Sequence, residues 1–109
     1  MPTKKLLEKD VEKAVKKYAV KLGFWTRKFR SAQNRGVHDD VFGTPDGVVF
    51  WIEFKRPGET WSELQFDEAK EMRACKLKTF LIDDIGEGKR LIDDMALFGE
   101  TEMQNNGAG

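Results

Sequence analysis

Glu53 and Lys55 are two charged residues at the end of an otherwise apolar segment, Val49-Phe50-Trp51-Ile52-Glu53-Phe54-Lys55. Side chains two positions apart on a β-strand point to the same face of the sheet. A central strand rarely carries charges unless they are paired or bind something. The spacing predicts a small polar site on one face of this strand. The simpler alternative is an ion pair between the two residues at the rim of a sheet.

The preceding segment predicts a partner for Glu53. Residues 43–47 read Gly-Thr-Pro-Asp-Gly, which is typical of a three-residue hairpin loop closed by a glycine. If Thr44 pairs with Val48, counting outward along both strands places Asp39 opposite Glu53, with Cβ atoms about 5 Å apart. A slip of one residue in the loop would bring Asp40 there instead, and both registers remain open at this stage.

Two carboxylates at that distance repel each other unless a proton or a cation lies between them. A hard divalent ion such as Mg²⁺ suits carboxylate oxygens and water. On the same face, Lys55 can orient or deprotonate a water, or stabilise charge on a phosphate. Asp46 lies at the hairpin tip, about 23 Å along the strand from Glu53, and is therefore a turn residue. These residues predict a metal-assisted hydrolytic site.

The elements that position this site follow from periodicity and turn signals. We expect helices over residues 3–22, from Thr60 or Ser62 to about 76, and over 88–98, and strands over 24–29, 37–42, 48–54 and 78–83. The order α-β-β-β-α-β-α predicts an α/β fold with one mixed central sheet flanked by helices. At 109 residues we expect a single domain over residues 1–99 and a flexible C-terminal tail over 100–109.

Composition narrows the class of protein. The single cysteine excludes an intrachain disulfide framework, and no apolar run reaches the roughly 20 residues that a membrane span needs. We therefore expect a cytoplasmic protein with no membrane partner. The formal net charge is zero, yet residues 1–35 hold eleven Lys or Arg and only three Asp or Glu. This basic third indicates a polyanionic partner, although a solvated lysine face on the first helix would look the same.

The chain resembles the PD-(D/E)XK nuclease superfamily, and within it the stand-alone VRR-NUC domains of phages and bacteria. The likeness extends from residue 8 to about residue 85. It is carried by Glu8 and Glu12 in the first helix, Lys28 in the first strand, Gly36-Val37-His38-Asp39, Glu53-Phe54-Lys55, Pro57-Gly58 and Gln65. His38 departs from the pattern, because the family usually has proline before the aspartate.

The resemblance implies a restriction-endonuclease-like core and a metal-dependent endodeoxyribonuclease that uses Mg²⁺ or Mn²⁺. It implies that Asp39, Glu53 and the backbone carbonyl of Phe54 bind the metal, together with Glu12 or Glu8. Lys55 would serve the attacking water. Gln65 would support the site, with a helix cap as its alternative role.

The expected substrate is DNA, with Lys28, Arg30 and Arg35 contacting phosphates. A domain without a separate sequence-reading module favours recognition of shape, so we expect cleavage of branched DNA such as four-way (Holliday) junctions. Symmetric cutting by one site per chain favours a homodimer, with apolar residues such as Trp51 or Phe42 at the contact. The alternatives are a nickase or restriction-like nuclease on another DNA substrate, and a non-catalytic nucleic-acid-binding module.

Overall fold

The computed structural model describes residues 6–29 and 40–107. Its elements follow the predicted order: α1 (Glu8–Lys21), β1 (Trp25–Lys28), β2 (Asp40–Gly43), β3 (Val49–Phe54), α2 (Glu63–Ala74), β4 (Lys78–Ile82) and α3 (Ile85–Gly107). The predicted α/β class with a mixed sheet is confirmed.

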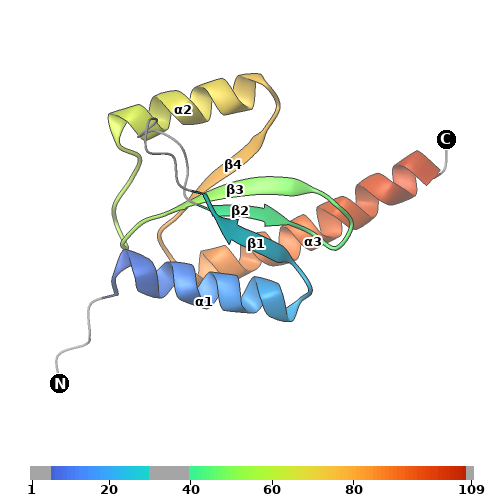
Figure 1. Ribbon diagram of the computed structural model, residues 1–109, viewed down its shortest axis with the longest axis horizontal. Helices are drawn as coiled ribbons and strands as arrows, with labels where there is room; N and C mark the ends of the chain where they lie inside the picture. The colour runs from blue at the N-terminus through green and yellow to red at the C-terminus, as the bar shows by residue number, and fades with distance from the viewer. Residues whose placement is uncertain (1–5, 30–39, 108–109) are drawn as a thin grey trace.

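The four strands form one sheet in the order β1-β2-β3-β4. Neighbouring pairs β1–β2 and β2–β3 are antiparallel, whereas β3 and β4 are parallel and are joined through α2. Figure 1 shows α1 and the start of α3 on one side of the sheet and α2 on the other. Each face of β3 is therefore covered by a different helical layer, and alternate residues of that strand enter different environments.

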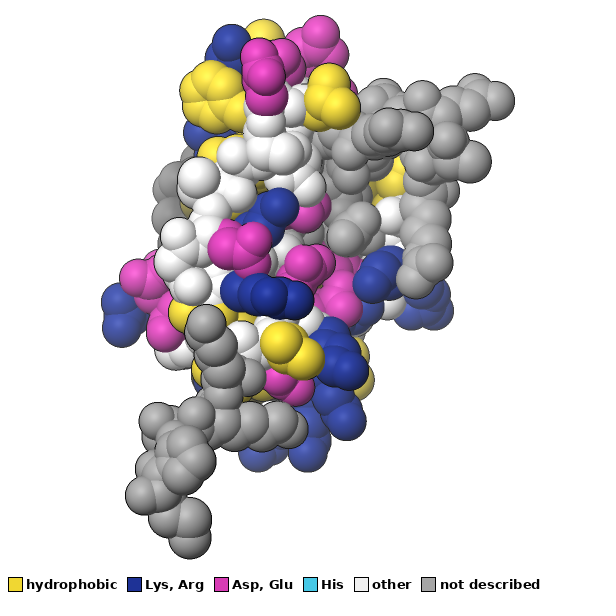
Figure 2. Space-filling view, turned by 90° about the vertical axis from the view of Figure 1, so that its left-hand side faces the viewer, with side chains coloured by type: hydrophobic (Ala, Val, Ile, Leu, Met, Phe, Trp, Pro, Cys, Tyr) yellow, Lys and Arg dark blue, Asp and Glu magenta, His cyan; other side chains and the backbone are white. Residues whose placement is uncertain are grey.

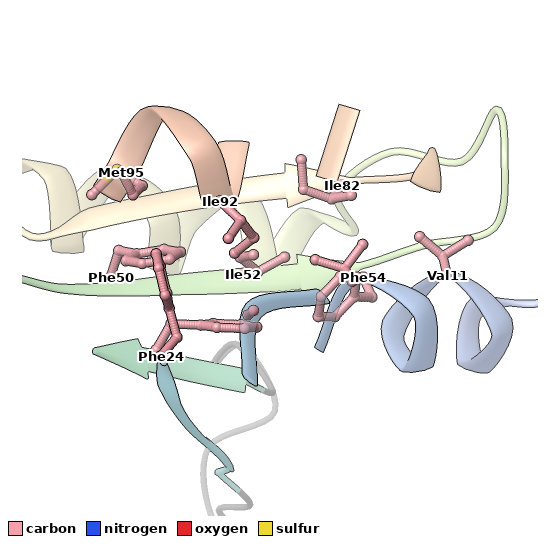
Figure 3. Packing of buried hydrophobic residues seen from close by; sticks show 11 residues of the cluster. Val11, Phe24, Phe50, Ile52, Phe54, Ile82, Ile92 and Met95 are labelled. Carbon is pink, nitrogen blue, oxygen red and sulfur yellow. The ribbon is translucent and has the colours of Figure 1, made fainter. Parts of the chain in front are cut away.

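The hydrophobic core lies between the sheet and the α1/α3 layer. Phe50, Ile52 and Phe54 of β3 all point to this side and are at most 1% exposed. They meet Val11 of α1 and Ile92 of α3 (Figure 3). Burying each large apolar side chain contributes roughly 1.5–3 kcal/mol. Because Phe50, Ile52 and Phe54 occupy one face, Trp51, Glu53 and Lys55 are assigned to the opposite face, toward α2.

The hairpin between β2 and β3 has the predicted three-residue loop. Thr44 N–H donates to the Val48 carbonyl at 2.9 Å, and Gly47 adopts a φ of +88°. The Thr44 hydroxyl accepts from the backbone N–H groups of Asp46 and Val48 at 3.2 and 3.0 Å. Glycine takes this left-handed conformation without steric penalty, so the local sequence is sufficient to set the loop length.

The ends of two helices differ from the sequence predictions. Helix α1 begins at Glu8 because Leu7 N–H donates to Asp10 Oδ2 at 2.8 Å; the expected start at Thr3 lies outside the described residues. Helix α3 begins at Ile85, where Asp84 Oδ2 accepts from Glu87 N–H at 2.9 Å. It continues to Gly107, beyond the end at residue 98 that the sequence predicts.

Two aromatic residues that we expected at a dimer contact are engaged within the chain. Phe42 is fully buried, with its ring stacked on Phe50 at a centroid distance of 5.2 Å. Trp51 is half-buried and meets the Phe29 ring edge-on at 5.5 Å. Phe42 is a core residue and has no surface to offer a partner, so that part of the expectation is wrong.

Candidate active site

The register of the hairpin decides between the two aspartates. Gly43 pairs with Val49, Phe42 with Phe50, and Asp40 with Ile52. The slipped register that would place Asp40 opposite Glu53 is therefore wrong. Asp39, which the unslipped register assigns to Glu53, lies outside the described residues, as do Arg30 and Arg35.

Glu53 is a buried carboxylate on the α2 side of β3. Its residue is 3% exposed, and it pairs with Leu81 of the parallel strand β4. Gln65 Nε2 donates to Glu53 Oε1 at 2.7 Å. Since the amide is neutral, this contact orients the carboxylate without cancelling its charge. The structure thus brings together Glu53 and Gln65, which lie in different elements.

Gln65 also caps helix α2, which is the alternative role that the sequence predicted for it. Ser62 Oγ accepts from Gln65 N–H at 3.2 Å, and Gln65 Oε1 accepts from Ser62 N–H at 2.9 Å. This reciprocal pair is a capping box, and it fixes the helix start at Glu63 rather than after Thr60. The Gln65 amide therefore uses its oxygen to fix the helix and its nitrogen to hold Glu53.

Lys55 follows directly after β3. Its backbone N–H donates to the Ile82 carbonyl at 2.9 Å, which continues the parallel ladder by one residue. Its side chain is half-buried, and no acidic side chain in the described segments lies within ion-pair distance of it. The simple Glu53–Lys55 ion pair is thus absent from the described segments. Phe54, between them, directs its side chain into the core.

A second group of charges lies on the other face of the sheet, beneath α1. Asp40 is fully buried, and Lys16 Nζ donates to its Oδ1 at 2.9 Å. Lys28 Nζ lies 3.5 Å from a carboxylate oxygen of Glu12. Asp40 and Lys28 are cross-strand partners, so both side chains leave the sheet on this side. Glu12, an expected metal ligand, and Lys28, an expected phosphate contact, thus belong to the α1 side, opposite Glu53.

The pKa values of this group show that Asp40 and Glu12 act as a pair. Burial raises the pKa of Asp40 to about 7, helped by its hydrogen bond with Glu12 and opposed by Lys16. Burial also raises the pKa of Glu12, but Asp40 and the charges of Lys28 and Lys16 outweigh it, and the net pKa of Glu12 is lowered. Asp40 Oδ2 has no donor among the described groups. A proton shared with Glu12 satisfies this oxygen and explains the raised pKa.

The sequence reasoning missed this pair, although one signal was available. The unslipped register places Asp40 on the same strand face as Phe42, and therefore in the core. A carboxylate buried there requires a cation, and Lys16 lies next to Val15 on the inner side of α1. Matching a charge on a core face of a strand with a lysine beside the apolar stripe of a helix would have identified the contact.

Both glutamates of α1 line a cavity at the end of the molecule where that helix begins. It has a volume of about 360 Å³ and is lined by Leu7, Glu8, Lys9, Glu12, Lys28 and Arg56. Figure 2 faces this end and shows acidic and basic side chains interleaved near its centre. Glu12 is the more buried of the two glutamates. Among the described residues, no three His, Cys, Asp or Glu side chains converge as a metal site.

The chain is similar to known proteins both in sequence and in structure. No family model matches the sequence. A protein of Acyrthosiphon pisum secondary endosymbiont phage 1, named "Putative nuclease p44", is 30% identical over 76 residues, which are 70% of this chain and 82% of the phage protein. A solved structure described as a VRR_NUC domain matches with a TM-score of 0.73 and 24% identity, over 79% of this chain and 94% of that one. The chain belongs to the same family as this phage protein, and its fold is that of a VRR_NUC domain.

The match covers nearly the whole VRR_NUC domain, so the core that the resemblance implied is confirmed as the fold of this chain. Within this VRR_NUC fold, β3 carries Glu53 and Lys55 where that strand ends, and α2 begins beside them with Gln65. No helix in the described segments is both long and apolar enough to cross a membrane.

Proposed function

We propose that this VRR_NUC protein is a divalent-metal-dependent endonuclease that hydrolyses phosphodiester bonds in DNA. The observation that carries the proposal is Glu53: a buried carboxylate at the end of a central strand, held by Gln65 at 2.7 Å, with Lys55 two residues on. An acidic side chain in that position is expensive for the fold. Its retention is explained if the carboxylate binds a cation.

The donor set fits Mg²⁺ or Mn²⁺. Carboxylates and backbone carbonyls are hard oxygen donors, which these ions prefer. We propose that Asp39, Glu53 and the Phe54 carbonyl hold the ion. Glu12 is left out of this ligand set, because it lies on the α1 side of the sheet beside Asp40 and Lys28. When bound, such an ion polarises the phosphate and lowers the pKa of a bound water.

The residues of the chain have distinct roles in this proposal. Gln65 fixes the direction of the Glu53 carboxylate, because its own amide is held by the cap of α2. Lys55 orients the attacking water and stabilises negative charge that develops on the phosphate.

The finer part of the proposal is the substrate. We propose branched DNA, in particular four-way junctions, cut symmetrically by a homodimer. Contacts to phosphates carry no direct sequence information and respond to the shape of the DNA. Two equivalent strands are most simply cut by two copies related by a twofold axis.

The experiment compares cleavage of labelled four-way junction, flap, duplex and single-stranded DNA in Mg²⁺, Mn²⁺ or EDTA. Wild type is measured beside Asp39→Asn and the control Asp46→Asn. We expect metal-dependent junction cleavage that falls at least about 100-fold in Asp39→Asn. Asp46→Asn should leave cleavage unchanged, because Thr44 and Gly47 make the turn contacts.

Each other outcome overturns a stated part of the proposal. Cleavage in EDTA would refute metal dependence, and equal loss in both variants would refute the assignment of Asp39. Preferred cleavage of plain duplex would indicate the nickase or restriction-like alternative. Tight DNA binding without cleavage of any substrate would leave a non-catalytic binding module.

A further inference from the structure

A groove between α1 and α3 lies on the far side of the sheet from Glu53. It has a volume of about 260 Å³ and is lined by Ala14, Lys17, Tyr18, Lys21 and Lys89. The first four residues recur at helical spacing on one side of α1, whereas Lys89 comes from the first turns of α3. Tertiary packing of two distant helices thus gathers three ammonium groups around one concave surface.

These lysines are available to an anion. Lys17, Lys21 and Lys89 are all exposed, and none is in an ion pair with any described acidic residue. Tyr18, which lines the groove, donates its hydroxyl to Asp93 Oδ1 at 2.7 Å, so an acidic side chain lies next to the groove. Lys89 Nζ lies over the Tyr18 ring at 5.6 Å. The groove therefore combines one aromatic ring with three exposed ammonium groups.

The positive charge continues along α1 beyond the groove. Lys13, Lys17 and Lys21 follow one another at intervals of four residues, which is about 6 Å along a helix. Lys13 is also exposed and outside the ion pairs of the described segments. Each strand of B-DNA carries one phosphate per about 3.4 Å of axis, so a row of three lysines about 12 Å long faces several phosphates. A small anion would contact only one of these lysines, whereas a sugar-phosphate backbone can contact all three.

We propose that the groove between α1 and α3 binds the sugar-phosphate backbone of DNA at a position separate from the cleavage site. The inference rests on the proposed function for its ligand, because DNA is the proposed substrate. Glu53 lies on the α2 side and the groove on the α1/α3 side. DNA held at both places presents two segments to two faces of one domain. A branched molecule does this without bending a duplex, which costs energy.

The test measures equilibrium binding of a fluorescent four-way junction, and of a single duplex with the length of one arm, in EDTA over a salt series. The variant Lys17→Ala/Lys89→Ala removes one lysine from each helix. The control Lys70→Ala/Lys76→Ala removes the same charge from exposed positions on and just after α2. All four side chains are exposed, so thermal unfolding should stay close to wild type for both variants.

We expect the groove variant to bind the junction at least about 10-fold more weakly, with the slope of log K against log salt reduced by about 2. The effect should be smaller for the single duplex, and the control should match wild type on both. Equal effects of the two variants would overturn the proposal. Equal loss on junction and duplex would refute the second-segment role.

The outcome is separable from that of the proposed function. Binding is measured in EDTA, so a protein that never cleaves can still show the specific loss. Conversely, if the wild type cleaves DNA but Lys17→Ala/Lys89→Ala binds the junction as tightly as wild type, the proposal for the groove is refuted and the proposed function is not. Failure of wild type to bind any DNA refutes both.

Discussion

Asp40 shows how one buried carboxyl links the stability of this domain to pH. The unfolded group titrates near its ordinary pKa of about 3.9, whereas in the folded protein burial raises the pKa to about 7. Between these values the folded chain keeps a proton that the unfolded chain releases. The free energy of unfolding from this group therefore falls as pH rises from about 4 to about 7. The lowered pKa of Glu12 acts oppositely, contributing stability that is lost as pH falls through its folded value.

The substitution Asp40→Asn should flatten this dependence. The Asn oxygen can still accept from Lys16, and its NH₂ can donate to Glu12 at any pH. We expect urea unfolding of the metal-free protein to show a weaker fall in stability between pH 4.5 and 7.5, and a variant at least as stable as wild type at pH 7.5. Asp46→Asn, the same change at an exposed turn, serves as control. Parallel pH profiles for wild type and Asp40→Asn would contradict the shared proton.

Gln65 joins the cap of α2 to Glu53, and its two functions can be separated. Gln65→Ala removes the donor to Glu53 and half of the capping box, whereas Ser62→Ala removes the main cap acceptor only. Both changes should destabilise the protein by about 1 kcal/mol in urea unfolding. Only Gln65→Ala should lower cleavage, by about 10–100-fold at saturating enzyme, because only there does Glu53 lose its orientation. Equal cleavage losses would mean that Gln65 acts through the helix alone.

At the scale of elements, α1 and α3 pack closely where Gly88 faces Val15. A Cβ at Gly88 would overlap Val15 Cγ2 and lie 3.1 Å from Ile82 Cγ2. In a helix, alanine is normally more favourable than glycine by about 1 kcal/mol. At position 88 the steric overlap acts against this gain in helix propensity. The close approach brings Lys89 beside Lys17 and Lys21 across the groove.

We expect Gly88→Ala to lower the free energy of unfolding by about 1–3 kcal/mol, since overpacking forces the helices apart. In Gly86→Ala the new Cβ meets only the Asp84 carboxylate, at 3.2 Å, and stability should change by no more than about 0.5 kcal/mol. Thermal and urea unfolding of both variants measure the difference. A stabilised Gly88→Ala would show that helix propensity outweighs the packing.

At the scale of the whole molecule, the two faces of the sheet divide the charged residues. Glu53 and Gln65 lie on the α2 side, and the Asp40 pair and the lysine groove lie on the α1/α3 side. Each chain has one Glu53 site, so two copies related by a twofold axis are the simplest arrangement for paired cuts in a junction. This reasoning carries the homodimer that we propose.

A mixing experiment tests the dimer. Wild type combined with excess Asp39→Asn should convert paired junction cuts into single nicks, because most wild-type chains then have an inactive partner. Gel analysis of a supercoiled junction-bearing plasmid distinguishes nicked from linear product. Paired cuts that merely decline in proportion to the wild-type fraction would indicate that each monomer acts alone.

Much of the site was predictable because its determinants are local. Pro45, Asp46 and Gly47 specify a loop of three residues, and loop length sets the β2–β3 register that excludes Asp40 as the partner of Glu53. Spacing predicts a capping box at Thr60 or at Ser62, and the structure forms the one between Ser62 and Gln65. Strand alternation places Glu53 and Lys55 on one face. Each of these follows from backbone geometry within a few residues.

Only the tertiary structure decided which distant charges meet. Lys16 contacts Asp40, Gln65 contacts Glu53, and Lys89 lines the same groove as Lys17. These contacts depend on the angle and offset at which each helix packs on the sheet, which the packing of the whole core determines. Periodicity predicts the apolar side of a helix, but not its rotation and height over the strands. The sequence by itself thus determines the order of the elements and the family resemblance, and it limits the hairpin to two registers, between which the structure decides. The packing around Val15 and Gly88 determines the buried carboxyl pair and the groove.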